Sequence, residues 1–170
     1  MNVLQDITFH ESNAKLLFID FRIRSDILIP SEITDDLGVE PTRAWAKGEK
    51  YLGKIFDPET KKVMSHWHER PWGIWGLDTK TAVQVRKVEH HVSYLLNILE
   101  PKQDKIRHYI EVDKYLVSFY IWWETTTGHG SYEIPAIQLE RLGRLCQYVE
   151  FGFLYTEEDD DIDKLKVGNE

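Results

Sequence analysis

The stretch Leu16-Leu17-Phe18-Ile19-Asp20-Phe21-Arg22-Ile23-Arg24 decides how the rest of the chain can be arranged. Its apolar residues, Ile19, Phe21 and Ile23, alternate with charged ones, and this period of two is typical of a half-buried β-strand. If the apolar side chains face the core, the opposite face of the strand carries Asp20, Arg22 and Arg24. The stretch therefore predicts a sheet with one buried face and one charged face.

A second strand is predicted over residues 115–124, which are strongly β-prone. Its two faces carry Val117, Phe119, Ile121 and Trp123 on one side and Leu116, Ser118, Tyr120 and Trp122 on the other. One face could place Tyr120 and Trp122, with Glu124, beside Arg22 and Arg24. Arginine next to aromatic rings stacks on a planar ligand or anchors a protein interface. The alternative is that the long middle helix covers this face and the aromatic residues are core.

Three helices are indicated by apolar spacing. Residues 30–38 begin with Pro30, carry acids early and end at Gly38. Residues 82–100 form the longest helix, which Pro101 ends. Their apolar stripe consists of Val85, Val88, Val92, Leu95, Leu96 and Leu99. A further helix is marked by Leu139, Leu142, Leu145, Cys146 and Val149.

Two further strands are predicted over residues 72–77 and 151–155, whereas residues 41–60 indicate a loop or a hairpin. Strands and helices then alternate along the chain, beginning and ending with a strand. We expect an α+β fold, specifically a ferredoxin-like sandwich of two βαβ-type halves with an extra helix inserted between them. The expected organisation is a flexible arm at 1–14, a single domain at 15–156 and an acidic tail at 157–170.

Composition excludes several classes of function. The 170 residues contain 29 Asp and Glu against 21 Lys and Arg, a net charge of −8, which argues against nucleic-acid or anionic membrane partners. No apolar run approaches the ~18 residues of a membrane span, and residues 1–15 lack the pattern of a signal peptide. A single cysteine, Cys146, suits a reducing compartment and is expected to be a buried, inert thiol. We expect a cytoplasmic protein without a cofactor.

The histidines offer candidates for metal binding. His66 and His68 project from the same face of a strand, but a metal would need a third ligand, from Glu69 or a distant histidine. The sequence therefore assigns no metal. His90 and His91 are adjacent on a helix, point about 100° apart and do not share an ion.

The most unusual local sequence is Gly128-His129-Gly130, followed by Ser131. Flanking glycines permit positive φ, so this loop could expose the His129 imidazole or aim N–H groups at an anion before the last helix. The alternative is a tight turn that holds His129 by hydrogen bonds. No P-loop lysine and no Gly-x-Ser-x-Gly motif accompanies it, so no catalytic residue is assigned.

Several stretches, in matching order over about residues 16–156, resemble the bacterial family called domain of unknown function 4279. They are Ile33-Thr34-x-x-Leu37-Gly38-Val39-Glu40-Pro41-Thr42-Arg43-x-Trp45-x-x-Gly48-Glu49; Trp72 to Leu77; Glu89-His90-His91-Val92-x-x-Leu95-Leu96-x-x-Leu99-Glu100-Pro101-Lys102; Trp122 to Gly130; and Phe151 to Tyr155. Family members often continue Gly-His-Gly with another glycine, where this chain has Ser131. The resemblance implies a compact bacterial α+β domain and brings no established reaction.

These observations favour a non-enzymatic protein-binding module, and by analogy with small acidic bacterial proteins, an immunity protein that neutralises a toxin. Another protein is the expected partner, and no nucleic acid or membrane is expected. A homodimer through a sheet edge or the Trp-rich segment is a further hypothesis. The alternative is a small-ligand-binding or metal-dependent enzyme with a cleft near the Gly-His-Gly loop. The candidate binding residues are Gly128, His129, Gly130, Arg22, Arg24, Trp67, Tyr120 and Trp122.

Overall fold

The computed structural model describes residues 14–57, 60–127 and 131–156, which form a mixed α+β fold. The strands are β1 (Ala14–Ser25), β2 (Arg43–Trp45), β3 (Lys50–Asp57), β4 (Lys62–Glu69), β5 (Gly73–Asp78), β6 (Leu116–Thr125) and β7 (Tyr148–Tyr155). The helices are α1 (Pro30–Leu37), α2 (Val88–Leu99), the 3₁₀ turn η1 (Glu100–Lys102), α3 (Gln103–Glu111) and α4 (Ala136–Gly143). The α+β prediction is thereby confirmed.

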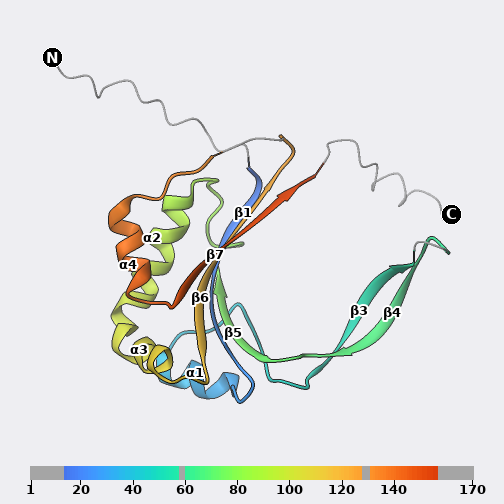
Figure 1. Cartoon of the computed structure of the whole chain (residues 1–170), viewed down its shortest axis with the longest axis horizontal. Helices are drawn as coiled ribbons and strands as arrows, with labels where there is room; N and C mark the ends of the chain where they lie inside the picture. Colours follow the sequence, from blue (N-terminus) through green and yellow to red (C-terminus); the bar gives the residue numbers. More distant parts are fainter. Residues whose placement is uncertain (1–13, 58–59, 128–130, 157–170) are drawn as a thin grey trace.

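Strand β1 lies at the centre of a five-stranded sheet with the order β2-β5-β1-β6-β7 (Figure 1). It pairs antiparallel with β5 on one side and with β6 on the other, and β7 adds to β6 in parallel. Strands β3 and β4 pair only with each other and form a separate two-stranded hairpin, the β3–β4 hairpin. Sequence had left residues 41–60 open between loop and hairpin, and they supply β2 and the first strand of this hairpin.

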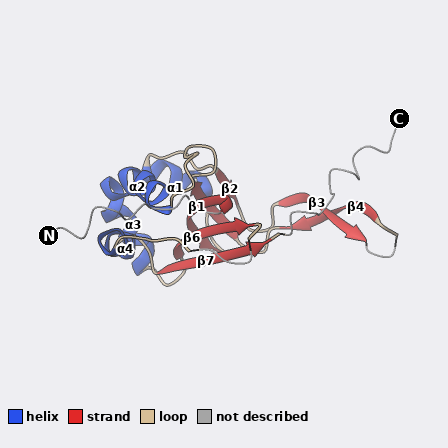
Figure 2. Ribbon diagram, turned by 90° about the horizontal axis from the view of Figure 1, so that it is seen from above, coloured by secondary structure: helices blue, strands red, loops and turns tan. Residues whose placement is uncertain are grey.

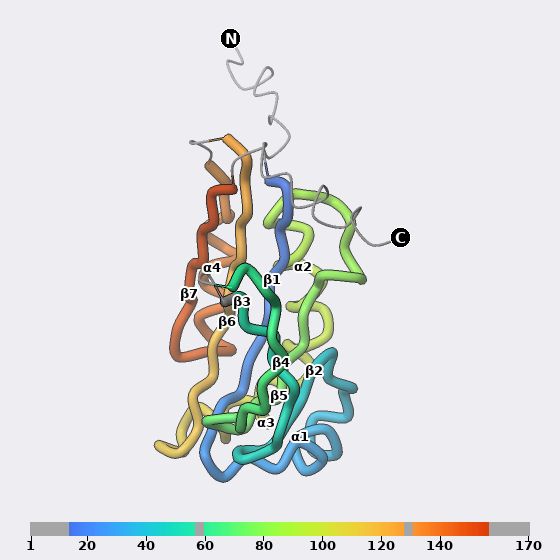
Figure 3. Tube along the Cα trace, turned by 90° about the vertical axis from the view of Figure 1, so that its right-hand side faces the viewer, coloured from blue at the N-terminus to red at the C-terminus, as the bar shows by residue number. Residues whose placement is uncertain are grey.

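The helices cover one face of the sheet, and the β3–β4 hairpin projects away on the other side (Figures 1 and 2). Figure 3 views the sheet from the side of the hairpin. An antiparallel sheet that is packed on one face has apolar and polar residues in alternation, as β1 has. In the described part of the chain, no helix has the length and apolar character needed to cross a bilayer.

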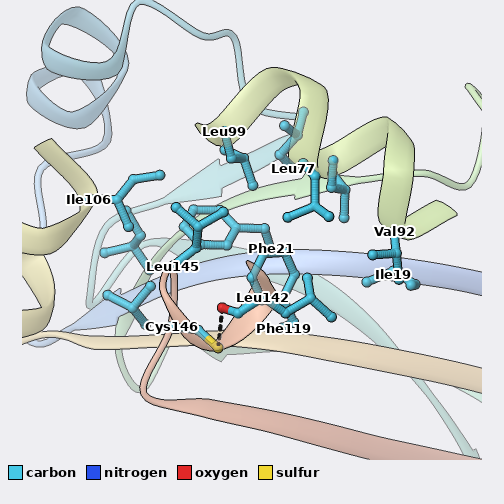
Figure 4. Close-up of a cluster of buried hydrophobic side chains, with 14 of the residues drawn as sticks. Ile19, Phe21, Leu77, Val92, Leu99, Ile106, Phe119, Leu142, Leu145 and Cys146 are labelled. Atoms are coloured by element: carbon cyan, nitrogen blue, oxygen red, sulfur yellow. Dashed lines mark hydrogen bonds between the residues drawn. The ribbon is translucent and has the colours of Figure 1, made fainter. Parts of the chain in front are cut away.

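The core lies between the sheet and α2, α3 and α4 (Figure 4). Its centre is Phe21 of β1, whose ring lies 5.1 Å from that of Phe119 and 6.3 Å from that of Trp75. All three aromatic side chains are fully buried. The apolar stripe of α2 packs on this group through Val92, Leu95, Leu96 and Leu99.

Two predicted helices are shorter in the structure. The long helix begins at Val88 rather than residue 82, and Val85 is exposed. The Val85 carbonyl accepts a hydrogen bond from the His91 imidazole, so this backbone group serves a side chain before the helix begins. The last helix ends at Gly143, because Leu145 and Cys146 continue into the core as a turn and Val149 already belongs to β7.

Cys146 is a buried thiol that bonds to the Leu142 carbonyl at 3.2 Å, and burial raises the pKa of that thiol to about 11. A thiol with such a pKa is not a nucleophile at neutral pH.

The predicted helix over residues 30–38 is confirmed. It ends where Gly38 adopts φ +61° and donates its N–H to the Thr34 carbonyl.

His91 ties α2 to the central strand. Its Nε2–H donates to the Val85 carbonyl at 2.8 Å, which leaves Nδ1 to accept from the Thr79 hydroxyl at 2.6 Å. The Thr79 oxygen in turn accepts the Ile19 backbone N–H at 2.9 Å. Burial lowers the pKa of His91 from its ordinary value of 6.5, which favours the neutral imidazole that this chain of hydrogen bonds uses.

We expect His91 to make stability depend on pH. Below about pH 6.5 the unfolded chain binds a proton at His91 more readily than the folded chain does, because burial lowers the pKa of His91 in the folded chain, so the free energy of unfolding falls as the pH falls from 7 toward 5. His91→Gln should lower stability by roughly 1–3 kcal/mol at pH 7 and reduce this slope. Urea unfolding of the wild-type chain and of His91→Gln at several pH values measures both the stability and its dependence on pH. Burial raises the pKa of Asp20, which acts in the opposite direction in both proteins. If the free energy of unfolding of the wild-type chain and of His91→Gln depended on pH in the same way, His91 would not be the source of the pH dependence.

Candidate functional site

The sheet face opposite the helices, termed the open face, collects the charged and aromatic side chains of β1 and β6. Register and alternating burial place on it Phe18, Asp20, Arg22, Arg24, Arg43, Gly76, Ser118, Tyr120, Trp122, Glu150 and Gly152. Tyr120 and Trp122 are half-buried, and α2 packs on the other face. The alternative in which the long helix covers these aromatic residues is therefore wrong, because that helix packs on Phe21 and Phe119 instead.

Asp20 is the electrostatic centre of the open face. Its carboxylate is fully buried, and one oxygen, Oδ2, accepts from Arg22 Nε at 2.6 Å and from the Arg43 guanidinium. Burial raises the pKa of Asp20 more than these two arginines lower it. The second oxygen has no hydrogen-bond partner among the described residues. Removing one partner of such a buried pair is costly, so Asp20 fixes the position of both guanidinium groups.

The aromatic residues of β6 lie beside these arginines. The Arg22 guanidinium lies 3.9 Å from the centre of the Tyr120 ring, in a cation–π contact. Trp122 lies between Tyr120 and Phe18, with ring centres 6.1 and 6.4 Å away. Arg24 is paired with Glu150 of β7 at 2.7 Å. The open face is thus lined with guanidinium groups and aromatic rings.

Gly152 of β7 permits this arrangement. A Cβ built at Gly152 would overlap the Tyr120 hydroxyl and would lie 2.8 Å from Trp122 Cε3, closer than real Cβ contacts. Tyr120 and Trp122 therefore extend across β7 only because position 152 has no side chain. The feature could have been found from sequence only with the β6–β7 register, which places Gly152 opposite Trp122.

A stack of side chains joins the open face to the β3–β4 hairpin. The Arg70 guanidinium lies 3.9 Å from the Trp45 ring centre and 3.8 Å from the Tyr51 ring centre. Tyr51 stacks on His68 at 5.4 Å, and His68 lies 5.2 Å from His66. The hairpin is thus attached at its base by cation–π and ring contacts.

The apolar residues of the hairpin beyond that base are exposed. By the β3–β4 register one face carries Leu52, Phe56, Val63 and Trp67, of which Trp67 is 64% exposed. A shallow depression of about 650 Å³ next to Trp67 is lined by Lys50, His68 and Glu69 as well. The pairs Leu52–Trp67 and Phe56–Val63 are separated on this face by Lys54 and Ser65. A two-stranded hairpin alone is marginally stable in water, and exposed apolar surface of this kind marks an interaction site.

The structure brings Arg22, Arg24, Tyr120 and Trp122 together on the open face, as the alternation of β1 and β6 predicted. Trp67 lies on the hairpin instead. His66 and His68 are neighbours, but within the described ranges no three metal-ligating side chains gather. Gly128, His129 and Gly130 lie outside the described residues, as do residues 1–13 of the predicted arm and the acidic tail at 157–170.

Sequence reasoning did not select Arg43, Trp45 or Arg70 as site residues. Arg43 and Trp45 are two residues apart, so they share one face of the short strand β2. That spacing was the signal in the sequence from which their common face could have been predicted. Arg70 lies next to Pro71 in a turn, where no periodicity indicates which way a side chain points.

The fold and the open face define an α+β domain with a one-sided sheet and a projecting hairpin. The model of the family described as domain of unknown function (DUF4279) matches residues 15–151, and the chain belongs to this family. No match was found among curated proteins or among solved structures.

Gly152→Ala tests the open face directly. We expect the new methyl group to displace Tyr120 and Trp122 and to lower the free energy of unfolding by about 1–3 kcal/mol. Tryptophan fluorescence and thermal unfolding measure the two effects. Gly143→Ala is the matched control, since a Cβ there meets no atom within 4 Å, and it should leave both unchanged or raise stability slightly. Equal behaviour of the two variants would contradict the packing described.

Proposed function

We propose that this chain is a non-enzymatic protein-binding module and that the open face and the β3–β4 hairpin contact its partner. The observation that carries the proposal is the hairpin itself, which exposes Leu52, Phe56, Val63 and Trp67 without support. Covering these side chains with a partner surface would bury apolar area that the folded chain leaves in water.

The open face supports the same proposal by its composition. Protein interfaces are enriched in Trp, Tyr and Arg, and their most sensitive residues are rigid, preorganised side chains. Arg22, Tyr120 and Trp122 fit this description, because Asp20, Gly152 and the ring contacts hold them in place. A partner would therefore meet a surface that needs little ordering on binding.

The charge of the chain indicates what kind of protein would bind. With a net charge of −8 the chain attracts basic partners at long range, which raises association rates. Toxin neutralisation in the cytoplasm of a bacterium is the specific form that we propose. Its support is this acidic charge together with the analogy to small acidic immunity proteins.

We also propose that the fold is ferredoxin-like. The support is the order β2-β5-β1-β6, in which every neighbouring pair is antiparallel and two β-α-β units, β1-α1-β2 and β5-α2-β6, interleave. The long helix α2 then belongs to the second unit and is not an extra helix between two halves as expected from sequence, because the strand expected to close the first half, β5, lies antiparallel to β1. Strand β7 extends the sheet at one edge. Strands β3 and β4 are inserted between β2 and β5.

Capture of the tagged full chain from its native cells, with mass spectrometry of bound proteins, tests the proposed function. Trp67→Ala and Trp122→Ala should each reduce recovery of one and the same partner by tenfold or more. Trp67→Ala should leave thermal unfolding unchanged, whereas Trp122→Ala removes ring contacts with Phe18 and Tyr120, so it should melt at a lower temperature but still be folded at the temperature of capture. Ile137→Ala removes an exposed apolar side chain from α4, on the covered face of the sheet, and should leave recovery intact.

Two results would count against the proposed function: no protein retained by the wild-type chain, or equal recovery with all three variants. If a partner is recovered, its effect on cell growth with and without the chain tests toxin neutralisation. Growth that does not depend on the chain would exclude that specific form while leaving protein binding in place.

A further inference from the structure

We infer that the free edge of β7 pairs with β7 of a second copy of this chain, antiparallel and centred on Phe151. Pairing of this kind goes beyond the proposed function, because the hairpin and the residues Arg22, Tyr120 and Trp122 of the open face do not take part in it.

Among the strands that the structure describes, β7 is the sheet edge without the usual protection. Natural sheets protect an edge by making it short or by placing lysine or proline on it. Strand β2, the other edge of the sheet, has three residues, and the hairpin strands carry Lys50, Lys54 and Lys62. Strand β7 has eight residues, YVEFGFLY, with no lysine, arginine or proline. Such an edge is a template for another strand.

The backbone groups available for pairing follow from the hydrogen bonds to β6. The Thr156 N–H donates to the Thr125 carbonyl of β6 at 3.0 Å, and the register from Ser118↔Tyr148 to Thr125↔Tyr155 has no shift. Even-numbered residues of β7 therefore bond to β6, and since backbone groups alternate along a strand, the N–H and C=O groups of Val149, Phe151, Phe153 and Tyr155 point away from β6. These four residues supply the hydrogen bonds to an added strand.

When a strand pairs antiparallel with its own copy, a two-fold axis passes through the middle of the pair. Near the middle of β7 this axis can lie at Glu150, Phe151 or Gly152. An axis at Glu150 would place two carboxylates opposite each other, which is unfavourable. An axis at Gly152 would place no side chain at the centre. An axis at Phe151 places the two Phe151 rings together, lets Glu150 pair with Gly152 of the second copy, and puts Tyr148 opposite Leu154. We therefore assign the axis to Phe151.

The side chains of β7 suit a second copy because a two-fold interface must complement itself. Tyr148, Phe151, Phe153, Leu154 and Tyr155 are all exposed, and the one charge, on Glu150, is already paired with Arg24 at 2.7 Å. If pairing buries about half of the surface of the four aromatic side chains, each copy buries on the order of 400 Å², not counting its backbone. Stable interfaces bury roughly 800 Å² per partner, so we expect a dimer that dissociates at micromolar concentration.

Pairing at this edge would join two sheets into one. An axis perpendicular to the sheet keeps both open faces on the same side, so they would form one continuous surface. The two hairpins would lie at its far ends, since each is connected to β2 and β5 at the opposite edge of its sheet. A partner could then contact both copies at once.

Cysteine cross-linking tests the pairing and its register. Because the Phe151 N–H and C=O groups face the second copy, the two Phe151 residues form a hydrogen-bonded antiparallel pair, in which the Cα atoms are about 5.5 Å apart and within reach of a disulfide. Phe151→Cys should therefore form a disulfide-linked dimer under mild oxidation. Phe153→Cys is the matched control, because Phe153 is 58% exposed like Phe151 but would lie roughly 13 Å from its own copy. The native Cys146 is buried and stays in both proteins.

Sedimentation of the full chain from about 1 to 500 µM supplies the second measurement. Wild type should shift from monomer to dimer, and Phe151→Lys should weaken dimerisation at least tenfold with a similar melting temperature. Phe56→Lys makes the same change at an equally exposed site, 58%, on the hairpin and should dimerise like wild type.

A wild-type chain that stays monomeric throughout would overturn the inference. So would a dimer that Phe56→Lys dissociates and Phe151→Lys does not, since the hairpin would then hold it. Cross-linking by Phe153→Cys and not by Phe151→Cys would overturn the assigned register. None of these results bears on capture of a different protein through Trp67 or Trp122, so failure here is distinguishable from failure of the proposed function.

Discussion

Strand β1 is hydrogen-bonded on both edges, to β5 and to β6, and this constraint determines where every other element can lie. A central strand has no free edge, so each of its side chains must point to one face or the other. Ile19, Phe21 and Ile23 therefore require an apolar cover, which the helices supply. The intervening Asp20, Arg22 and Arg24 are committed to the open face by the same geometry.

The open face stays ordered without a covering layer because its side chains hold one another. Asp20 anchors two guanidinium groups, and Arg22 in turn lies over Tyr120. These contacts offset part of the energetic cost of burying Asp20, while one carboxylate oxygen has no partner among the described residues. The result is a rigid surface of arginine and aromatic rings, and next to it a hairpin whose apolar side chains lack such support.

Predictions from sequence succeeded where a pattern within a short segment, such as alternation along one strand, was set by that segment alone. The alternation in β1 and β6 placed Arg22, Arg24, Tyr120 and Trp122 on one face, and Pro30 with Gly38 bounded α1. They failed at boundaries that a distant group sets. Val85 fits the helical stripe of α2, but its carbonyl is taken by His91, and Leu145 and Cys146 fit a helix that has already ended at Gly143.

By itself the sequence determined the two-faced central strand, the α+β class and the absence of a recognisable catalytic motif, because these depend on spacing within short segments. Only the tertiary structure decided which face the helices cover, how Arg43 and Arg70 join the open face, and that β7 is left with a free edge. These features depend on contacts between segments tens of residues apart. No local period encodes such contacts, since they arise only when the strand order is fixed.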